Sequence, residues 1–358
     1  MNYNDYRRHS REIGVGGLTI GGKSPITVQS MTNTDTHDLE ATYQQVLRLE
    51  RAGCDIIRIT APDIESVSTF SALKARGVKA PLVADIHFDY KIALAAIEAG
   101  VDKVRINPGN IGSKDRVYEV VCACRERSIP IRIGVNSGSL EKSILAKYGS
   151  PTAEALAESA LYHASLLEEF DYRNIAISVK SSDVQTMIRA NRILAERTDY
   201  PLHLGVTEAG ARTRALVKSS IGVGTLLAEG IGDTVRVSLT DDPTEEIAAA
   251  RAILDSLDLS EKRGMDIVSC PTCGRTKIDL IKLLSDFEGR VKAEGLEGKS
   301  IKVALMGCVV NGPGEAREAD IGIAGGRGEA LLFKKGEIVR KIDENNLIDQ
   351  LIAEIKEM

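Results

Sequence analysis

Three cysteines and one glutamate near the C-terminus have the types and spacing of a metal-cluster site. Cys270 and Cys273 form a CxxC pair, Cys308 follows in a glycine-containing segment, and Glu315 comes shortly after it. Three thiolates are one short of the four that a structural zinc or an ordinary iron–sulfur cluster takes. All histidines lie at or before His203, so Glu315 is the nearest fourth ligand. This set predicts a [4Fe–4S] cluster whose carboxylate can be exchanged for a substrate oxygen.

Zinc and a redox dithiol are the alternative interpretations of a CxxC pair. Zinc would need a fourth cysteine or histidine, and the sequence offers none nearby. A thioredoxin-type dithiol would leave Cys308 unexplained. The other cysteines, Cys54, Cys122 and Cys124, lie in apolar segments and are predicted to be small buried hydrophobic residues.

A second group consists of basic residues near the ends of short apolar segments: Arg58, Arg105, Arg132, Lys180 and Arg236. Charges inside apolar strands are costly unless they are paired or solvated. At the mouth of a barrel they would converge into a pocket for phosphate or diphosphate. We expect only one or two of them to be paired, because few carboxylates occur at matching positions. The polar residues at the same level are Asp85, His87, Asn107, Asn136, Thr207, Glu208 and Ser238.

The elements that must position these residues alternate between apolar strands and amphipathic helices. The predicted strands are 26–31, 54–60, 81–86, 103–107, 130–136, 174–180, 201–208 and 234–240, with helices such as 38–52, 153–170 and 182–197 between them. A last helix begins with Asp242 as its cap and Pro243 in its first turn. Eight β-then-α units predict an α/β fold, the TIM (β/α)8 barrel, with a doubly wound sheet as the alternative.

The sequence beyond this repeat predicts a second, smaller domain. We expect a TIM-barrel substrate-binding domain over residues 1–257, a charged linker over 258–264 and a small α+β cluster domain over 265–358. The second domain should contain a helix over 276–294, strands at 300–306, 321–324, 330–334 and 337–342, and a closing helix over 345–356.

Composition narrows the functional class. The chain has 358 residues, a net charge of −5 and no tryptophan, which argues against nucleic-acid binding and attraction to membranes. No secretion signal and no apolar run long enough to span a bilayer is apparent. A cytoplasmic location, where thiols stay reduced, is therefore expected.

Motifs spread along the chain resemble those of the bacterial 4-hydroxy-3-methylbut-2-enyl diphosphate synthase family of the non-mevalonate isoprenoid pathway. The matching segments run in the family order from residue 28 to residue 315 and together are highly specific. They are 28–34 (VQSMTNT), 84–87 (ADIH), 104–109 (VRINPG), 131–136 (IRIGVN), 205–210 (GVTEAG), 232–239 (GDTVRVSL), 269–276 (SCPTCGRT) and 311–315 (NGPGE).

The resemblance implies an iron–sulfur oxidoreductase that opens and dehydroxylates 2-C-methyl-D-erythritol 2,4-cyclodiphosphate with two electrons. It implies that Cys270, Cys273, Cys308 and Glu315 hold a [4Fe–4S] cluster and that Glu208 is the acid near the departing hydroxyl. Flavodoxin or ferredoxin would deliver the electrons. The implied substrate-binding residues are Arg58, Asp85, His87, Arg105, Arg132, Asn136, Lys180, Thr207, Arg236, Ser238 and Asn311.

The linker is short, which raises the question of how a cluster domain can reach a barrel mouth. About seven residues span roughly 23 Å at most, and the last barrel helix carries the chain from the mouth to the opposite face. A head-to-tail homodimer, in which each cluster domain covers the partner's barrel, solves this, and the resemblance implies it. The alternative functions are another TIM-barrel phosphate-binding transferase with a structural metal domain, and a non-enzymatic iron–sulfur sensor or scaffold.

Overall fold

The computed structural model describes residues 3–260, 264–309 and 316–358. The chain divides into two compact units, residues 1–260 and 261–358, and each is described by itself. The division falls inside the predicted linker. Among the described residues, no helix has the length and apolar character needed to cross a membrane.

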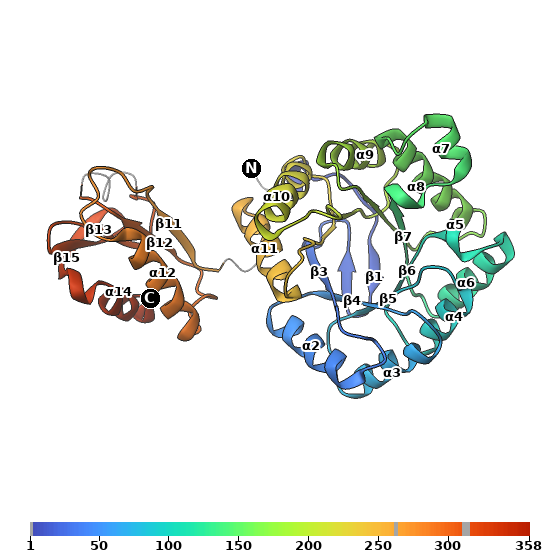
Figure 1. The fold of residues 1–358 in the computed structure, drawn as a ribbon, viewed down its shortest axis with the longest axis horizontal. Coiled ribbons are helices and arrows are strands. Elements are labelled where there is room, and N and C mark those ends of the chain that lie inside the picture. Colours follow the sequence, from blue (N-terminus) through green and yellow to red (C-terminus); the bar gives the residue numbers. More distant parts are fainter. Residues whose placement is uncertain (1–2, 261–263, 310–315) are drawn as a thin grey trace. The chain divides into compact units, whose positions relative to one another are not determined.

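The first unit is a barrel of parallel strands surrounded by helices (Figure 1). Its strands are β3 Thr27–Met31, β4 Ile56–Thr60, β5 Leu82–Asp85, β6 Lys103–Ile106, β7 Ile131–Asn136, β8 Ile175–Lys180, β9 His203–Leu204 and β10 Thr234–Val235. They are ordered β8-β7-β6-β5-β4-β3-β10-β9. A bridge between Ile177 and Leu202 joins β8 to the start of β9 and closes the ring. The TIM-barrel prediction is confirmed.

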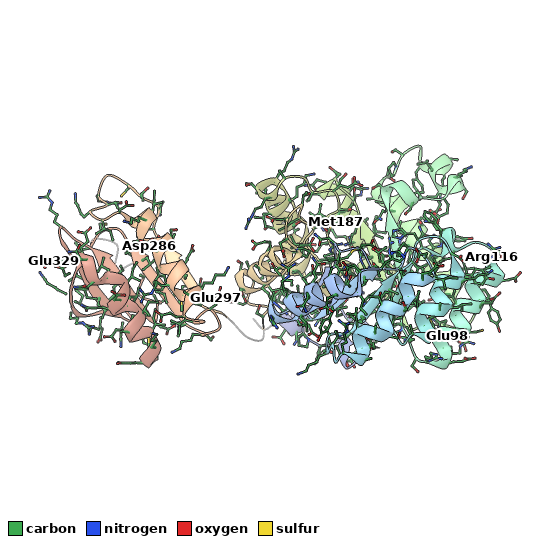
Figure 2. The ribbon with its side chains drawn as sticks, turned by 60° about the horizontal axis from the view of Figure 1, so that its bottom comes forward. Glu98, Arg116, Met187, Asp286, Glu297 and Glu329 are labelled. Atoms are coloured by element: carbon green, nitrogen blue, oxygen red, sulfur yellow. The ribbon has the colours of Figure 1, made fainter. Side chains whose placement is uncertain are left out.

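The helices of this unit bury their apolar faces against the strands, in one continuous core. They are α1 Tyr3–Tyr6, α2 Leu39–Arg51, α3 Ser68–Ala75, α4 Tyr90–Glu98, α5 Pro108–Ile111, α6 Lys114–Glu126, α7 Lys142–Tyr148, α8 Ala153–Glu168, α9 Val184–Arg197, α10 Arg212–Ala228 and α11 Pro243–Ser256, with short 3-10 helices at Glu65–Val67 and Ser137–Ser139. Figure 2 shows Glu98 and Arg116 on the outer helices and Met187 on α9.

Aspartates begin several of these helices by accepting a hydrogen bond from an amide of the first turn. Asp38 caps α2, Asp89 caps α4 and Asp183 caps α9. Asp242 caps α11 by accepting from the Thr244 amide, with Pro243 in the first turn, as the sequence predicted. These caps fix where each helix leaves the strand that precedes it.

A short hairpin that the sequence did not reveal closes the bottom of the barrel. Strands β1 Ile13–Val15 and β2 Leu18–Ile20 pair antiparallel. Their buried side chains pack with the first inward residues of three barrel strands, Ile56, Val83 and Ala176. Each strand has only three residues, too few for a period-2 pattern to be recognised. The barrel is therefore sealed below and can receive a ligand only from its other end.

The second unit is a mixed five-stranded sheet with two main helices. The strands β11 Asp266–Ser269, β12 Lys302–Met306, β13 Ile321–Gly325, β14 Glu329–Lys334 and β15 Glu337–Asp343 are neighbours in this order, and the helices are α12 Leu280–Ala293 and α14 Leu347–Glu357, with a 3-10 turn at Glu344–Asn346. The pairs β11–β12 and β12–β13 are parallel, whereas β13–β14 and β14–β15 are antiparallel. Strand β11 was not predicted. It has only four residues, too few for a recognisable pattern, and it ends directly before Cys270.

Candidate active site

The register of the barrel strands brings the predicted cations to one end. Asp85 pairs with Thr60 of β4 and with Arg105 of β6, and Arg105 pairs with Arg132 of β7. Because inward positions alternate with outward ones along each strand, these residues point into the barrel. Asp85, Arg105, Arg132 and Lys180 are all less than a tenth exposed. The structure therefore gathers them inside one barrel.

Asp85 holds two of the cations. The carboxylate accepts a hydrogen bond from Nη1 of Arg105 at 3.0 Å, and Nε of Arg58 lies 3.7 Å from its other oxygen. Burial alone would raise the pKa of Asp85, but Arg58 and Arg105 overcome this and hold it well below its usual range. Burial also lowers the pKa of Arg58, to about 10. Asp85 therefore stays ionised and fixes both guanidinium groups before any ligand binds.

Arg236 is held by a carboxylate that the sequence interpretation overlooked. Glu246 of α11 accepts from Nε and Nη2 of Arg236, both at 3.1 Å, from the Ser30 hydroxyl at 2.8 Å and from the Leu239 amide. With Arg58 and Arg105, this makes three paired cations, so the expectation of one or two was wrong. Glu246 lies between Pro243 and Ala250 on the buried face of α11. A glutamate at an apolar position of an amphipathic helix is the signal that could have revealed it.

Arg132 and Lys180 contact no carboxylate among the described residues. Arg132 donates a hydrogen bond to the Gln29 side chain at 3.3 Å, while its Nε is buried without a partner. No hydrogen bond of the Lys180 ammonium group is found within the described part of the chain. Burial, followed by the surrounding cations, lowers the pKa of Lys180 well below its usual range. Such unsatisfied donors are what an anionic ligand would complete.

Two glycines make room for these side chains. A Cβ atom at Gly134 would lie 2.3 Å from Nε of Arg105, and one at Gly205 would lie 3.0 Å from Nζ of Lys180 and 2.7 Å from the Arg236 carbonyl oxygen. Any larger residue would therefore displace the guanidinium or the ammonium group. The glycines of the 131–136 and 205–210 motifs are part of the site for this steric reason.

Other predicted residues surround the opening. Glu208 is exposed and follows β9 with a left-handed backbone angle, φ 51°. Nε2 of the exposed His87 ring lies 3.5 Å from Nη1 of Arg105, and Asn136 and Ser139 form a capping box at the end of β7. A non-glycine residue in the left-handed region costs free energy, and such strain gathers at functional sites.

Thr207 and Ser238 are partly buried and follow β9 and β10. The Thr207 amide donates to the Ser181 carbonyl group, which ties this segment to the end of β8. The side chain of Asn107, which follows β6, accepts from the Gly109 amide. Asn107 thus serves locally as the cap of α5.

The cysteines lie at one edge of the second unit. Ser269 of β11 pairs with Leu305 of β12, so the chain leaves both strands at neighbouring points, just before Cys270 and Cys308. The Gly307 amide approaches Sγ of Cys270 at 3.3 Å, and the Cys273 amide donates to the Thr276 hydroxyl group at 3.0 Å. The three thiols are free. The strand order thus brings Cys308 to the CxxC pair across thirty-five residues of sequence.

The chemistry of this donor set fits an iron–sulfur cluster. Hydrogen bonds from the Arg275 amide and side chain lower the pKa of Cys273, which favours the thiolate that a metal binds. Among the described residues, no three metal-binding side chains gather closely enough for a single ion. In a cluster each thiolate binds a different iron, so wider spacing is expected. Asn311 and Glu315 lie outside the described residues.

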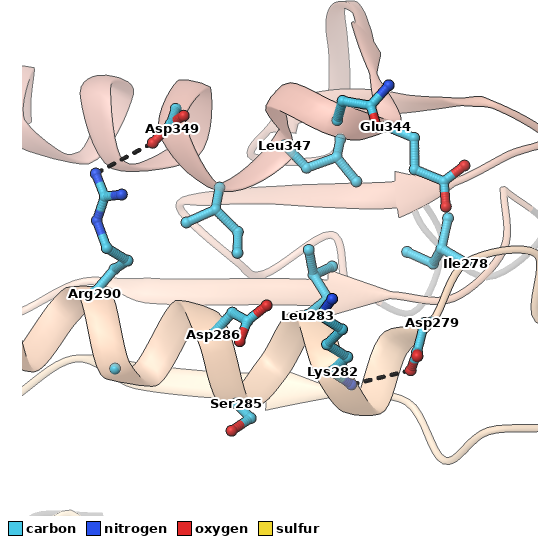
Figure 3. Close-up of a pocket in the computed structure, with 13 residues that line it drawn as sticks. Ile278, Asp279, Lys282, Leu283, Ser285, Asp286, Arg290, Glu344, Leu347 and Asp349 are labelled. Atoms are coloured by element: carbon cyan, nitrogen blue, oxygen red, sulfur yellow. Dashed lines mark hydrogen bonds and ion pairs between the residues drawn. The ribbon is translucent and has the colours of Figure 1, made fainter.

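The second unit also has a cavity of about 800 Å³ between α12 and α14 (Figure 3). Its lining is mainly polar and includes Asp286, Lys282 and the ion pair between Arg290 and Asp349, whose atoms are 3.2 Å apart. None of the predicted site residues lines it. The cavity therefore stands apart from the cysteines.

Both units match known families. The family described as GcpE TIM-barrel domain matches residues 10–251, and the one described as GcpE protein C-terminal domain matches residues 266–357. The relative named 4-hydroxy-3-methylbut-2-en-1-yl diphosphate synthase (flavodoxin) from Clostridium acetobutylicum is 58% identical over 352 residues, which are 98% of this chain and 99% of the relative. The protein of that name from Clostridium perfringens is 56% identical over 350 residues, covering 98% and 99% of the two chains.

Solved structures resemble the barrel unit more distantly. A type I 3-dehydroquinate dehydratase from Clostridium difficile has a TM-score of 0.51 at 15% identity, covering 70% of this chain and 98% of that one. The dihydropteroate synthase of Yersinia pestis has a TM-score of 0.50 at 14% identity, covering 70% and 99%. At this level of identity the likeness shows the fold alone.

Proposed function

The chain belongs to the GcpE family, and we propose that it converts 2-C-methyl-D-erythritol 2,4-cyclodiphosphate into (E)-4-hydroxy-3-methylbut-2-enyl diphosphate. Identity with synthases of this name over nearly the full length carries the proposal. The barrel agrees with it, because its buried cations exceed its buried carboxylates and so favour a small polyanion. The enzyme is an oxidoreductase of isoprenoid biosynthesis.

The reaction breaks the bond between carbon 2 of the substrate and its phosphate oxygen, and expels the hydroxyl group of carbon 3 as water. A double bond forms between the two carbons. Two electrons and one proton balance the change: the proton leaves with the hydroxyl group as water, and the freed phosphate oxygen stays anionic. The protein must therefore hold the diphosphate, supply electrons, and place a proton donor beside the departing hydroxyl.

The diphosphate binds to the cations at the barrel mouth in this proposal. Arg58, Arg105 and Arg236 are already oriented by Asp85 and Glu246, so their binding geometry needs little rearrangement. Arg132 and Lys180 are buried and contact no carboxylate among the described residues, so their donors are open to the ligand. The remaining proposed contacts are Asp85, His87, Asn136, Thr207, Ser238 and Asn311.

Glu208 is the proposed proton donor to the departing hydroxyl. Glu208 is exposed in the segment that follows β9, four residues beyond Leu204, and its left-handed backbone fixes the direction in which the side chain leaves the chain. Removing the carboxyl group should stop the loss of water while leaving diphosphate binding close to normal.

Cys270, Cys273, Cys308 and Glu315 are proposed to hold a [4Fe–4S] cluster, which supplies electrons one at a time when it is bound. The observation in favour is the convergence of three free thiols at the ends of two adjacent strands. The relatives' names include flavodoxin, and we propose flavodoxin or ferredoxin as the electron donor of this chain. A cytoplasmic location, where these thiols stay reduced, completes this part of the proposal.

A homodimer with shared sites is proposed because of the course of the chain. Helix α11 begins at the barrel mouth and has 14 residues, so it ends about 21 Å away near the opposite face. The proposed linker, residues 258–264, starts from there. A second copy can bring its cysteine unit to the mouth of this barrel more easily than the same chain can.

Mixing two inactive variants tests this assembly. Cys308→Ser damages only the cysteine unit and Glu208→Ala only the barrel, so a hybrid dimer can combine one intact barrel with one intact cysteine unit. Subunit exchange should restore up to about a quarter of the wild-type activity for random pairing. No recovery, with exchange confirmed by native mass spectrometry, would exclude action between chains.

The reaction itself is tested by anaerobic turnover. Protein purified without oxygen should convert the cyclodiphosphate when dithionite and a viologen dye replace the natural donor, and the linear diphosphate can be identified by NMR. A protein with full iron content that forms no product would contradict the proposal. The alternative of a phosphate-binding transferase with a structural metal domain predicts a colourless zinc protein and has only the fold in its favour.

A further inference from the structure

Arg132 of the predicted mouth also belongs to a deeper group of polar side chains, here called the inner polar group: Thr27, Gln29, Lys103, Arg132, His203 and Thr234. Each is buried, with at most 7% of its surface exposed. Thr27 pairs with Thr234 across β3 and β10, and Nδ1 of His203 lies 2.5 Å from the Thr234 hydroxyl. The apolar floor formed with the β1–β2 hairpin lies beneath this group.

Several atoms of the inner polar group have no hydrogen-bond partner among the residues that the structure describes. They are Oγ1 of Thr27, Nε2 of Gln29, Nε of Arg132 and Nε2 of His203. All of them can donate a hydrogen bond, although the histidine nitrogen does so in only one tautomer. A buried set of donors without acceptors favours the approach of negative charge.

Lys103 is the least expected member of the group. It begins β6, two residues before Arg105, so both side chains point to the interior, and Val83 of the floor is its neighbour on β5. Its side chain is 1% exposed. Within the described residues, neither an ion pair nor a hydrogen bond of its ammonium group is found. A charged lysine in this position would have no compensation in the free protein.

Charged and titratable side chains enter the barrel interior from the strands β4 to β10. They are Arg58 on β4, Asp85 on β5, Arg105 on β6, Arg132 on β7, Lys180 on β8, His203 on β9 and Arg236 after β10, with Glu246 of α11 behind Arg236. The two carboxylates are already paired with arginines. Burial, followed by Arg132 and Arg58, lowers the pKa of Lys103 well below its usual range. Lys180 and His203 are shifted in the same direction.

We propose that Lys103 is a proton-accepting residue of the substrate site, uncharged in the free enzyme and charged when a diphosphate occupies the barrel mouth. A cyclic diphosphate adds two negative charges to an interior that has excess positive charge. Its field favours the ammonium form of a nearby buried lysine, and a proton enters from solvent. Binding of the substrate and uptake of a proton are then linked, so affinity falls as the pH rises.

This inference rests on the proposed function, and the experiment separates the two. The cyclodiphosphate is titrated calorimetrically into the anaerobic holoenzyme without reductant, in buffers of different ionisation enthalpy. Its phosphates have no group that titrates near pH 7, so any proton exchanged belongs to the protein. No binding would contradict the proposed function. Binding without proton uptake would overturn only the inference.

Two substitutions test whether Lys103 is the residue that takes up the proton when the substrate binds. Lys103→Met should remove much of the uptake and weaken binding about tenfold at pH 7, the equivalent of one pKa unit. Lys103→Arg carries a permanent charge, so it should also lose the uptake while keeping more of the affinity. Lys79→Met, at an exposed lysine before β5, is the control and should match the wild type. Unchanged uptake in Lys103→Met would overturn the inference and point to Lys180 or His203.

Unfolding provides a second measurement that does not depend on substrate. A lysine whose pKa is lowered by folding makes the folded state less stable at every pH below the unfolded pKa of about 10.4. Lys103→Met should therefore shift the urea midpoint upwards at pH 7, and the gain should shrink as the pH approaches that value. A lower midpoint at pH 7 would show that Lys103 is charged and stabilised in the free enzyme, and would contradict the inference.

Discussion

The barrel and the cysteine unit hold their functional side chains in different ways. In the barrel, Asp85 and Glu246 lock three arginines through ion pairs on rigid strands. In the second unit, the cysteines follow the ends of β11 and β12, and among the described residues hydrogen bonds such as that between the Lys277 amide and the Gly307 carbonyl hold this edge. The barrel arginines are held in place before any ligand binds, whereas the thiols would depend on the proposed cluster for their final arrangement.

This difference has a physical cause. Arginine and carboxylate compensate each other inside the protein, so the barrel can fold around its charges without substrate. The thiols have no charged partner of this kind among the described residues, and the proposed metal binding would provide the free energy that orders them. Substitutions in the barrel should therefore lower substrate affinity and stability by partial amounts. Those at the cysteines should remove cluster binding and turnover completely.

The largest effect is expected at the cysteines. Serine at Cys270, Cys273 or Cys308 should abolish the broad visible absorption of the anaerobic protein and all turnover, because each thiolate binds one iron in the proposed cluster. Cys122→Ser, at a half-buried cysteine of α6, is the matched control and should retain both. Iron analysis and absorption spectra check this. Full cluster content in any one of the three variants would remove that cysteine from the ligand set.

The next largest effects are expected for two arginines of the barrel, whose substitutions should differ in their effect on stability. Arg132→Ala and Arg236→Ala should each weaken substrate binding by about 1.5–3 kcal/mol, the contribution of a charge-assisted hydrogen bond. Arg236→Ala should also destabilise the fold by about 3–5 kcal/mol, because it leaves Glu246 buried without its cation. Arg132 has no carboxylate partner within the described residues and should show no such loss.

Calorimetry and urea unfolding measure these two quantities, and the double variant Arg236→Ala with Glu246→Gln is the control. Replacing the stranded carboxylate by an amide should restore part of the stability but none of the affinity. If both arginine variants bound the cyclodiphosphate normally, the ligand would have to bind elsewhere.

Because of Asp85, the free energy of unfolding should depend on pH in the acidic range. Its pKa is lower in the folded chain than in the unfolded one, so its contribution is present above the unfolded pKa of about 3.9 and is lost as the pH falls below that value. Asp85→Asn should cost about 1–3 kcal/mol at neutral pH. Its stability should also fall less steeply between pH 5 and pH 2, which urea titrations can measure. Parallel curves for the two proteins would contradict the assignment.

The smallest change in the free energy of unfolding is expected for substitutions of Glu208. Glycine accepts the left-handed backbone of this position more easily than glutamate does, so Glu208→Gly should stabilise the protein by up to about 1 kcal/mol. Glu208→Ala should bring no such gain. Both variants should lose turnover if Glu208 donates the proton. Thermal unfolding distinguishes the two, and a less stable glycine variant would mean that the glutamate side chain supports the fold.

Much of the fold was predictable from the sequence because strands and helix starts depend on patterns within a few neighbouring residues. The eight apolar strand segments, the Asp242–Pro243 helix start and the cysteine spacing are each visible within a few residues, and the strands and this helix start occur as expected. The last two strands proved shorter, with two ladder residues each, since the chain beyond them turns into the mouth. The basic residues near the strand ends predict a polyanion site, and this stays a prediction.

By itself, the sequence determined the (β/α)8 repeat and the strands and helices that follow it, while the domain bounds and the grouping of residues at the mouth and around the cysteines stay predictions. Only the tertiary structure decided which charges compensate one another. The partnership of Glu246 with Arg236, the room that Gly134 leaves for Arg105, and the isolation of Lys103 above an apolar floor all join residues that are distant in the chain or on separate strands. Electrostatic compensation depends on distance and burial in three dimensions, and no local pattern of residues encodes either.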